Sequence, residues 1–364
     1  MSGEQYSSWN LLVREAAEQF RQAGIDPADA ENEARQIFSF VTGKDRTWLF
    51  LHGDEKVLHE DGKAPDGVQR FLNLARERAK RIPLAYVLGE RDFFGRTFLV
   101  TPDVLIPEPE TELLVEQVLQ ERSSRKNARN TSTSATEKLL SNEFTKVFQK
   151  EKAPAAQKSL RILDLCTGSG CIAITLAAEL AAEATHGAEP AAEATHGVEP
   201  AAAAEAARGA KAEAKSTALE IVAADISEAA LRVAAENAKK ILGSDADLVR
   251  FVRSDLFAEI EGSFEIIVSN PPYIATEEIG DLAVEVAEYT PKLALDGGDD
   301  GLVIYRRIAE EAPQYLNEGG WLFLEIGYDQ GESVPALLAG QGWRKISVIR
   351  DYSGLDRIVV AERP

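Results

Sequence analysis

A chain of 364 residues with 45% hydrophobic content is long enough for two compact domains, each with its own core. Its 60 acidic residues outnumber 40 basic ones, so the formal net charge at pH 7 is −20. This acidity disfavours stable binding to nucleic acid, because neutralising phosphates requires a basic surface. The only cysteines are Cys166 and Cys171, which excludes a disulfide framework and fits a reducing compartment.

The sequence contains no run of about 18 apolar residues, and its first ten residues lack the features of a signal peptide. We therefore expect a cytoplasmic protein without a membrane partner. His52, His59, His186 and His196 lie away from every motif described below, so histidine-dependent triads and zinc sites lack their parts. We expect no metal, and a His186–His196 metal pair is less favoured than a duplicated loop.

Residues 1–82 predict a small helical domain without chemistry of its own. Apolar residues recur there at helical spacing. Caps and prolines mark four helix starts, at Ser7 or Ser8, Asp26-Pro27, Asp45 and Gly67. The fourth helix is expected to extend to Arg81 and to end before Pro83.

Residues 83–112 predict a linker that contains a β-hairpin. From Leu84 to Val104 the sequence is rich in aromatic and β-branched residues, with Gly95 between two such runs. A helix is then expected over 113–119, at the start of a second domain that extends to residue 364.

Two segments of this second domain have the composition of insertions. Residues 121–158 are rich in Ser, Thr, Asn, Lys and Arg, which predicts a mobile surface loop. Residues 181–218 contain AAEATHGAEP followed directly by AAEATHGVEP and an Ala-rich tail. The duplication predicts a tolerant loop, partly helical because alanine favours helix.

The rest of the second domain alternates strands with helices. Strands are expected over 161–165, 219–224, 248–252, 264–269, 319–326, 344–349 and 356–361. This alternation is typical of an α/β fold, in which helices cover both faces of a mostly parallel sheet. The last two strands, separated by the turn-like segment 351–354, predict an edge hairpin.

The first strand leads into a glycine-containing turn before a helix that begins near Cys171. The residues of this candidate ligand-binding turn are Asp164, Cys166, Thr167, Gly168, Ser169 and Gly170. Such a turn lets a ligand approach the backbone and the helix N-terminus, although it can also be purely structural. Cys166 stands at the first glycine position of the dinucleotide fingerprint, which favours a ligand without a pyrophosphate.

Acidic residues end the next two strands. Asp225 could accept both ribose hydroxyls of an adenosine ligand, or the position could serve only to begin a helix, as Ser227 also could. Gly170 and Asp225 are 55 positions apart, and 17 without the insertion 181–218, close to the expected spacing. Asp255 could meet an adenine amino group beside Leu256 or Phe257, although a surface turn is as good an explanation.

The strongest motif is Asn270-Pro271-Pro272-Tyr273, which follows an apolar strand. Two prolines lack N–H groups and stiffen the backbone, so the loop presents acceptors only. The Asn270 side-chain oxygen and the Pro271 carbonyl could each take one hydrogen of a substrate –NH2 group. Tyr273 offers a flat face against that group. A strand-terminating turn is the weaker interpretation.

With these motifs the chain resembles class I S-adenosylmethionine methyltransferases, and more narrowly the bacterial peptide chain release factor N(5)-glutamine methyltransferases. The resemblance covers all but the two insertions. It rests on the segments 82–90 (IPLAYVLGE), 93–95 (FFG), 101–107 (TPDVLIP), 109–112 (PETE), 164–170 (DLCTGSG), 269–273 (SNPPY), 294–301 (ALDGGDDG), 324–331 (LEIGYDQG) and 351–358 (DYSGLDRI).

The resemblance implies a Rossmann-like sheet of seven strands, S-adenosylmethionine as methyl donor, and transfer to the glutamine amide of a release factor's Gly-Gly-Gln motif. It implies catalysis by Asn270, Pro271 and Tyr273, with Pro272 also contacting substrate. The cofactor would contact the glycine turn and the following strand ends, namely Asp164, Cys166, Thr167, Gly168, Ser169, Gly170, Asp225, Asp255, Leu256 and Asn270. One departure is Glu108, where the family usually has arginine.

Three alternatives stay open at this point. An adenine-N6 nucleic-acid methyltransferase shares the Asn/Asp-Pro-Pro-Tyr loop, but the charge of −20 weighs against stable nucleic-acid binding. A non-enzymatic binding protein could retain the fold, against which the intact motifs argue. The helical domain either docks class I release factors or only stabilises the chain.

Overall fold

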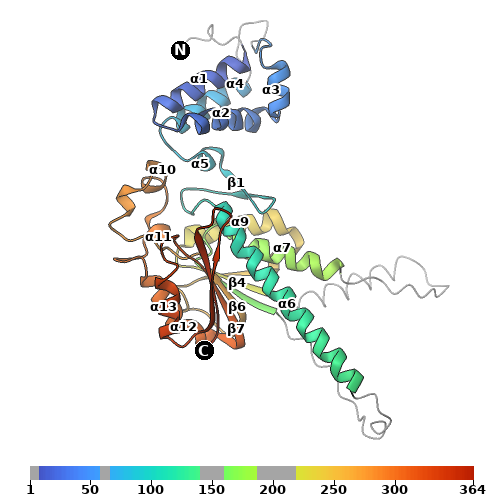
Figure 1. Cartoon of the computed structure of the whole chain (residues 1–364). Helices are drawn as coiled ribbons and strands as arrows, with labels where there is room; N and C mark the ends of the chain where they lie inside the picture. The colour runs from blue at the N-terminus through green and yellow to red at the C-terminus, as the bar shows by residue number, and fades with distance from the viewer. Residues whose placement is uncertain (1–7, 58–65, 140–159, 187–218) are drawn as a thin grey trace, which may run out of the picture. The chain divides into compact units, whose positions relative to one another are not determined.

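The computed structural model describes residues 8–57, 66–139, 160–186 and 219–364 (Figure 1). The chain divides into two compact units. The helical unit comprises Met1–Arg91, Val100–Pro102 and Gly280–Lys292, and the sheet unit comprises Asp92–Leu99, Asp103–Ile279 and Leu293–Pro364.

The helical unit begins with the four predicted helices. Their bounds are α1 Trp9–Gln22, α2 Pro27–Thr42, α3 Arg46–His52 and α4 Asp66–Arg78. The predicted caps are confirmed, because the side chains of Ser8, Asp26 and Asp45 accept hydrogen bonds from backbone N–H groups in the first turns of α1, α2 and α3.

The strand expected from Leu84 is wrong over its first five residues, which form helix α5 (Leu84–Leu88). Gly89 ends this helix in the left-handed conformation at φ 77°. The hairpin itself is confirmed: β1 (Glu90–Phe93) pairs with β2 (Arg96–Leu99). Phe94 and Gly95 between them both have positive φ, as a tight hairpin turn requires.

Aromatic side chains form the core of the helical unit. Phe20, Phe38 and Phe71 are fully buried. The ring of Trp9 contacts Phe38 and Phe71 edge to face, with centroid distances of 5.2 and 5.8 Å. These contacts join α1, α2 and α4 into one packed cluster.

The segment 280–292, distant in sequence, belongs to this unit through a buried ion cluster. Arg78 is 3% exposed; its Nε donates to Glu33 at 2.7 Å and its Nη1 to Glu285 at 3.1 Å. Arg81 also donates to Glu285, from Nε at 2.7 Å. Glu285 lies in the short helix α10 (Val284–Ala287), which the arginines thereby hold against the helical unit.

We predict that Arg78→Met lowers the stability of the helical unit by about 2 kcal/mol, because two carboxylates lose a buried partner while Arg81 retains one of them. Native-state hydrogen exchange of α2 and α4 would measure this loss. Lys80→Met is the matched control, since its ion pair with Glu77 is exposed and should be worth less than about 0.5 kcal/mol. Equal protection in both variants would refute the role of the cluster.

All seven predicted strands of the sheet unit are confirmed. Their bounds are β3 Leu160–Leu165, β4 Leu219–Asp225, β5 Val249–Arg253, β6 Phe264–Ser269, β7 Leu316–Glu325, β8 Arg344–Arg350 and β9 Asp356–Glu362. They form one sheet in the order β5-β4-β3-β6-β7-β9-β8, parallel from β5 to β7. The last two strands form the expected hairpin, with β8 at the edge and β9 antiparallel to both neighbours.

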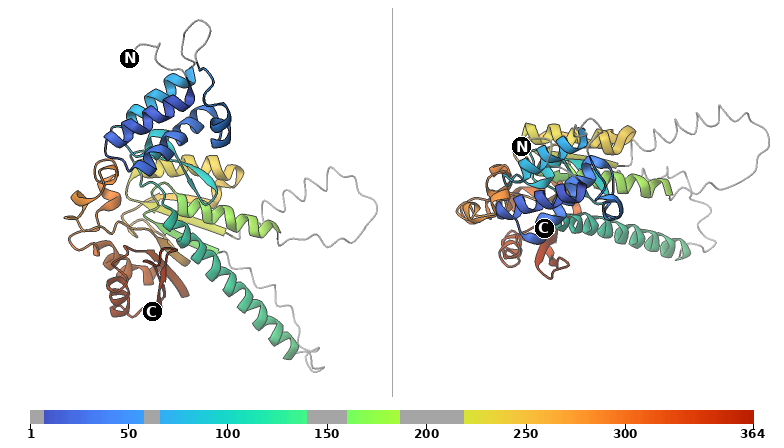
Figure 2. Two further views of the ribbon diagram at one scale, coloured as in Figure 1. Left: turned by 45° about the horizontal axis from the view of Figure 1, so that its top comes forward. Right: turned by 90° about the horizontal axis from the view of Figure 1, so that it is seen from above.

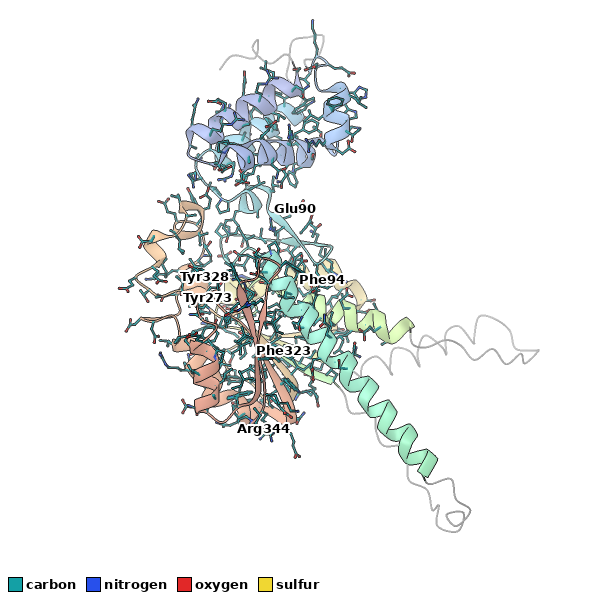
Figure 3. All side chains as sticks on the ribbon, in the orientation of Figure 1. Glu90, Phe94, Tyr273, Phe323, Tyr328 and Arg344 are labelled. Atoms are coloured by element: carbon teal, nitrogen blue, oxygen red, sulfur yellow. The ribbon has the colours of Figure 1, made fainter. Side chains whose placement is uncertain are left out.

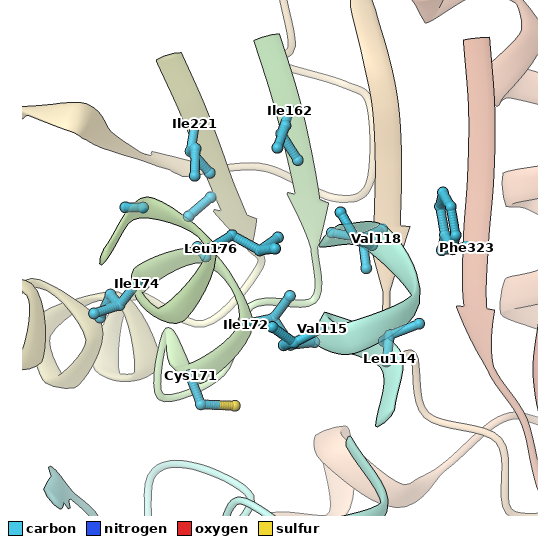
Figure 4. Packing of buried hydrophobic residues seen from close by; sticks show 14 of the residues in the cluster. Leu114, Val115, Val118, Ile162, Cys171, Ile172, Ile174, Leu176, Ile221 and Phe323 are labelled. Atoms are coloured by element: carbon cyan, nitrogen blue, oxygen red, sulfur yellow. The ribbon is translucent and has the colours of Figure 1, made fainter. Parts of the chain in front are cut away.

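Helices cover both faces of the sheet, and alternate strand residues face each layer. Ile162, Ile221 and Phe323 belong to the core beneath α6 (Pro109–Leu139) and α7 (Cys171–His186), as Figure 4 shows. Helix α9 (Glu228–Leu242) lies beside α7 (Figure 2). Leu163 and Leu322 face the other layer, which contains α12 (Val303–Tyr315) and α13 (Ser333–Gly340).

The two predicted insertions only partly coincide with the described residues. The loop expected over 121–158 is wrong from 121 to 139, because α6 continues to Leu139. Helix α7 continues to His186, and the rest of both segments, with His59, His196 and the His186 side chain, lies outside the described residues. In the parts of the chain that the structure describes, no helix has the length and apolarity needed to cross a membrane.

The strand order reverses between β3 and β6. From β3 the chain adds β4 and β5 on one side, and from β6 it adds β7 on the other. In open parallel sheets such a reversal opens a crevice at the carboxyl ends of the strands, where ligands bind. The polar motifs found in the sequence follow these same strand ends.

Candidate active site

The turn after β3 has the backbone freedom that close ligand approach requires. Cys166, Gly168 and Gly170 have φ values of 58°, 54° and 80°. A Cβ at Gly170 would lie 2.7 Å from Ile174 Cδ1, so this glycine allows α7 to pack on its neighbours. At Gly168 a Cβ would meet no atom within 4 Å, so this glycine leaves open space beside the turn.

The acidic residue at the end of β3 is part of the protein interior. Asp164 is fully buried, and the Thr167 hydroxyl donates to its Oδ2 at 2.6 Å. Burial raises the pKa of Asp164 to about 7, against the effect of that hydrogen bond. Burial also raises the pKa of the Cys171 thiol to about 12 and that of Cys166 further, so neither sulfur is a thiolate at neutral pH.

Asp225 at the end of β4 faces the glycine turn. Its Oδ2 accepts from Gly168 N–H at 2.9 Å and its Oδ1 from Ser227 N–H at 2.8 Å. Burial is the main cause of its raised pKa. Ser227 caps α9, so the predicted helix start belongs to Ser227 and not to Asp225. Ile226 N–H is also directed at this carboxylate, and the acceptor capacity that remains fits a ribose hydroxyl.

A surface pocket of about 570 Å³ lies beside Asp225, lined by Ile226, Val252, Arg253, Ser254, Asp255, Ala258 and Glu259. Asp255 thus lines the space next to the predicted ribose site, but its carboxylate accepts from Arg307 Nη1 at 2.8 Å. Leu256 has φ 50° and is buried, and Phe257 stacks on Tyr315 within the core. These two side chains therefore lie beneath the pocket and not in its lining.

Asn270 begins the loop after β6, which is parallel to β3. Its Nδ2 donates to Thr111 Oγ1 at 3.2 Å. Among the residues that the structure describes, no hydrogen bond reaches Asn270 Oδ1 or the Pro271 carbonyl. The Asn270 side chain and Pro272 are half-buried, while Pro271 is buried. Two acceptors at the tip of β6 are thus available to a donor.

Gly297 and Gly301 pack closely against the backbone of the loop that contains Tyr273. A Cβ at Gly297 would lie 2.8 Å from Tyr273 Cα, and one at Gly301 would lie 2.4 Å from the Tyr273 carbonyl oxygen. Gln330 Nε2 donates to that same oxygen at 3.1 Å. Sequence reasoning used the 294–301 and 324–331 motifs only for resemblance and missed this supporting role.

Tyr273 is half-buried and Glu325 is buried, and the two lie in the same region. Tyr273 follows β6 and Tyr328 follows β7, the adjacent parallel strand (Figure 3). Burial raises the pKa of Tyr273 above its ordinary value, and the nearby Glu325 carboxylate adds to this. Glu325, at the end of β7, is 1% exposed, and burial raises its pKa to about 8. The sequence analysis assigned no role to Glu325 or Thr111.

Glu108, the departure from the expected arginine, is exposed just before α6. Its backbone carbonyl accepts from Thr111 N–H at 3.1 Å. Its negative charge adds to the effect of burial in raising the pKa of both Glu325 and Tyr273. An arginine at this position would have the opposite effect on both groups.

Comparison with known proteins agrees with this geometry. The PrmC N-terminal domain family matches residues 12–89, and the methyltransferase small domain family matches residues 207–299. The fold and the site together are those of a methyltransferase with an N-terminal helical domain.

Curated relatives are more specific. The release factor glutamine methyltransferase of Cereibacter sphaeroides is 36% identical over 97% of this chain and 97% of its own length. That of Geobacter sulfurreducens is 32% identical over 93% of this chain and 90% of its own. The bifunctional methyltransferase of Rickettsia felis is 30% identical, and this chain spans 58% of it. The chain belongs to the release factor glutamine methyltransferase family, as its motifs predicted, and is an enzyme of that kind.

We predict that Gly297→Ala lowers kcat for methyl transfer by about 10- to 100-fold, because its Cβ displaces the Tyr273 backbone and with it the acceptors before it. The Kd for S-adenosylmethionine, measured by calorimetry, should change less than about threefold, since the glycine turn is untouched. Gly340→Ala is the control, because a Cβ there meets no atom within 4 Å. An unchanged kcat in Gly297→Ala would contradict the supporting role.

Proposed function

We propose that this enzyme transfers a methyl group from S-adenosylmethionine to the side-chain amide nitrogen of the glutamine in the Gly-Gly-Gln motif of class I peptide chain release factors. The observation that carries the proposal is the pair of available acceptors, Asn270 Oδ1 and the Pro271 carbonyl, at the tip of β6. An amide –NH2 group has two hydrogens to donate. Family membership supports the substrate, and a cytoplasmic location fits that role.

The residues around the glycine turn fit S-adenosylmethionine. Asp225 keeps acceptor capacity for a ribose hydroxyl, Gly168 leaves open space, and Asp255 lines the adjacent pocket. We expect Asp164, Cys166, Thr167, Ser169 and Gly170 to shape the turn around the methionine part, with Leu256 beneath the adenine and Asn270 close to the methyl. When bound, the cofactor supplies an electrophilic methyl group on a sulfonium.

Asn270 and Pro271 would act by positioning. An amide nitrogen is a poor nucleophile, because its lone pair is delocalised into the carbonyl. Hydrogen bonds from both N–H groups to Asn270 Oδ1 and the Pro271 carbonyl would fix the nitrogen and direct its lone pair at the methyl. Alignment of this kind is worth up to roughly 7–11 kcal/mol. The product can lose its proton after transfer, so no strong base is required.

Tyr273 and Pro272 would form the walls of the substrate position. Burial and the adjacent Glu325 keep the Tyr273 phenol protonated, so it offers a neutral flat face. The helical unit would dock the release factor, because one glutamine side chain offers too little surface for selectivity. The adenine-N6 alternative is not favoured, since relatives that match nearly the whole chain are named release factor glutamine methyltransferases.

A methyl-transfer assay with labelled S-adenosylmethionine tests the proposal. We expect label on a purified release factor, and none on the same factor with its Gly-Gly-Gln glutamine changed to alanine. Label on both proteins would place the reaction at another atom. Label on neither, with cofactor bound, would overturn the proposed substrate.

We predict opposite effects for two substitutions at the site. Asn270→Ala should lower kcat at least about 100-fold and leave cofactor affinity within about threefold, because it removes a contact to the reacting nitrogen. Asp225→Ala should weaken cofactor binding by about 30-fold or more, because two charge-assisted hydrogen bonds are lost. Calorimetry and steady-state kinetics on each variant separate the two effects, and exchanged results would reject both assignments.

A further inference from the structure

An asparagine side chain has an accepting end and a donating end, and only the accepting end can bind a substrate –NH2 group. We infer that Thr111 and Glu325 are positioning residues that hold the Asn270 carbonyl oxygen toward the substrate nitrogen. The inference rests on the proposed function, since it concerns how the same site orients its nucleophile.

Three elements bring these side chains together. Asn270 follows β6, Thr111 lies in the first turn of α6, and Glu325 ends β7. Thr111 and Glu325 are 2% and 1% exposed, so water does not compete for their bonds. The Thr111 hydroxyl donates to the Glu325 carboxyl, and Asn270 Nδ2 donates to Thr111 Oγ1 at 3.2 Å.

In this series of hydrogen bonds, Asn270 donates to Thr111 and Thr111 donates to Glu325. A hydroxyl has one hydrogen, and Thr111 uses it for Glu325, so only lone pairs are left to face Asn270. The –NH2 end of Asn270 satisfies them. The flipped amide would set one acceptor against another in a buried site, which is unfavourable. Asn270 Oδ1 is therefore directed away from Thr111 and is available to a donor.

Glu325, the last acceptor in this series of hydrogen bonds, lies on a backbone that is itself held by hydrogen bonds. The Tyr305 hydroxyl donates to the Glu325 backbone carbonyl at 2.7 Å, and Ile326 N–H donates to the Arg357 carbonyl at 2.9 Å. Whether the Glu325 carboxyl is charged or neutral, it keeps an oxygen that accepts from Thr111. Glu325 Oε2 has no hydrogen-bond partner among the described residues, so the Thr111 hydroxyl donates to the other carboxyl oxygen, Oε1.

Thr111→Val tests the inference, because it keeps the shape of the side chain and removes the hydroxyl. We expect kcat for release-factor methylation to fall about 10- to 100-fold, with KM for the release factor and Kd for S-adenosylmethionine within about threefold. Thr111→Ser keeps the hydroxyl and should restore kcat to within about threefold of the wild type. Thr175→Val is the matched control, since Thr175 is also buried but its hydroxyl has no partner among the described residues.

A double-mutant cycle separates positioning from general stability. In the Asn270→Ala background, Thr111→Val should change the single-turnover rate by less than about twofold, because the side chain it orients is gone. If Thr111 had a structural role separate from Asn270, the rate losses caused by Thr111→Val and Asn270→Ala would multiply in the double variant.

The inference is overturned if Thr111→Val keeps wild-type kcat, if Thr111→Ser is equally impaired, or if the two losses multiply. Failure of the proposed function gives a different result, because the wild-type enzyme would then bind S-adenosylmethionine without methylating the release factor.

Discussion

The reversal of strand order between β3 and β6 is the constraint on which the site depends. Adjacent parallel strands end at the same edge of the sheet, so the turn after β3 and the loop after β6 are neighbours although about 100 residues separate them. Short side chains at the two strand ends are therefore close enough to form one site. The sheet register sets the turn after β3 and the loop after β6 side by side, and these are the segments to which we assign the cofactor and substrate contacts.

Polar groups at these strand ends are buried or half-buried, which costs free energy unless they are paired. The structure pairs most of them with groups from neighbouring elements: Asp164 with Thr167, Asp225 with two backbone N–H groups, and the Tyr273 carbonyl with Gln330. Each pairing also fixes a geometry, because a buried hydrogen bond restricts both partners. The site is therefore rigid where the proposed chemistry requires alignment, and this agrees with catalysis by positioning.

The strands and their terminal residues were predictable because their signals are local. β3, β4 and β6 are apolar runs, which is typical of strands buried on both faces. Asp164 is the next-to-last residue of β3, Asp225 is the last residue of β4, and Asn270 directly follows β6. Helix α5 was missed because five residues rich in Leu, Val and Tyr read equally well as a strand. The membership of 280–292 in the helical unit was missed because Arg78 and Glu285 are 207 residues apart. A pattern within a short stretch of sequence cannot predict an ion pair between residues so far apart.

Glu325 is a residue that the sequence could have indicated as a candidate for a role in the site. It is a lone acid in an otherwise apolar strand end, and such a residue is rarely buried without a reason. Its surroundings are acidic as well, since Glu108 and Glu110 oppose ionisation while Arg357 favours it. With a pKa raised to about 8, the carboxyl is mainly neutral at pH 7 and avoids the cost of a buried charge. A neutral carboxyl still accepts from Thr111. Glu108, where the family usually has arginine, therefore changes the charge near Glu325 and leaves the acceptor in place. We infer that the orientation of Asn270 depends on this acceptor.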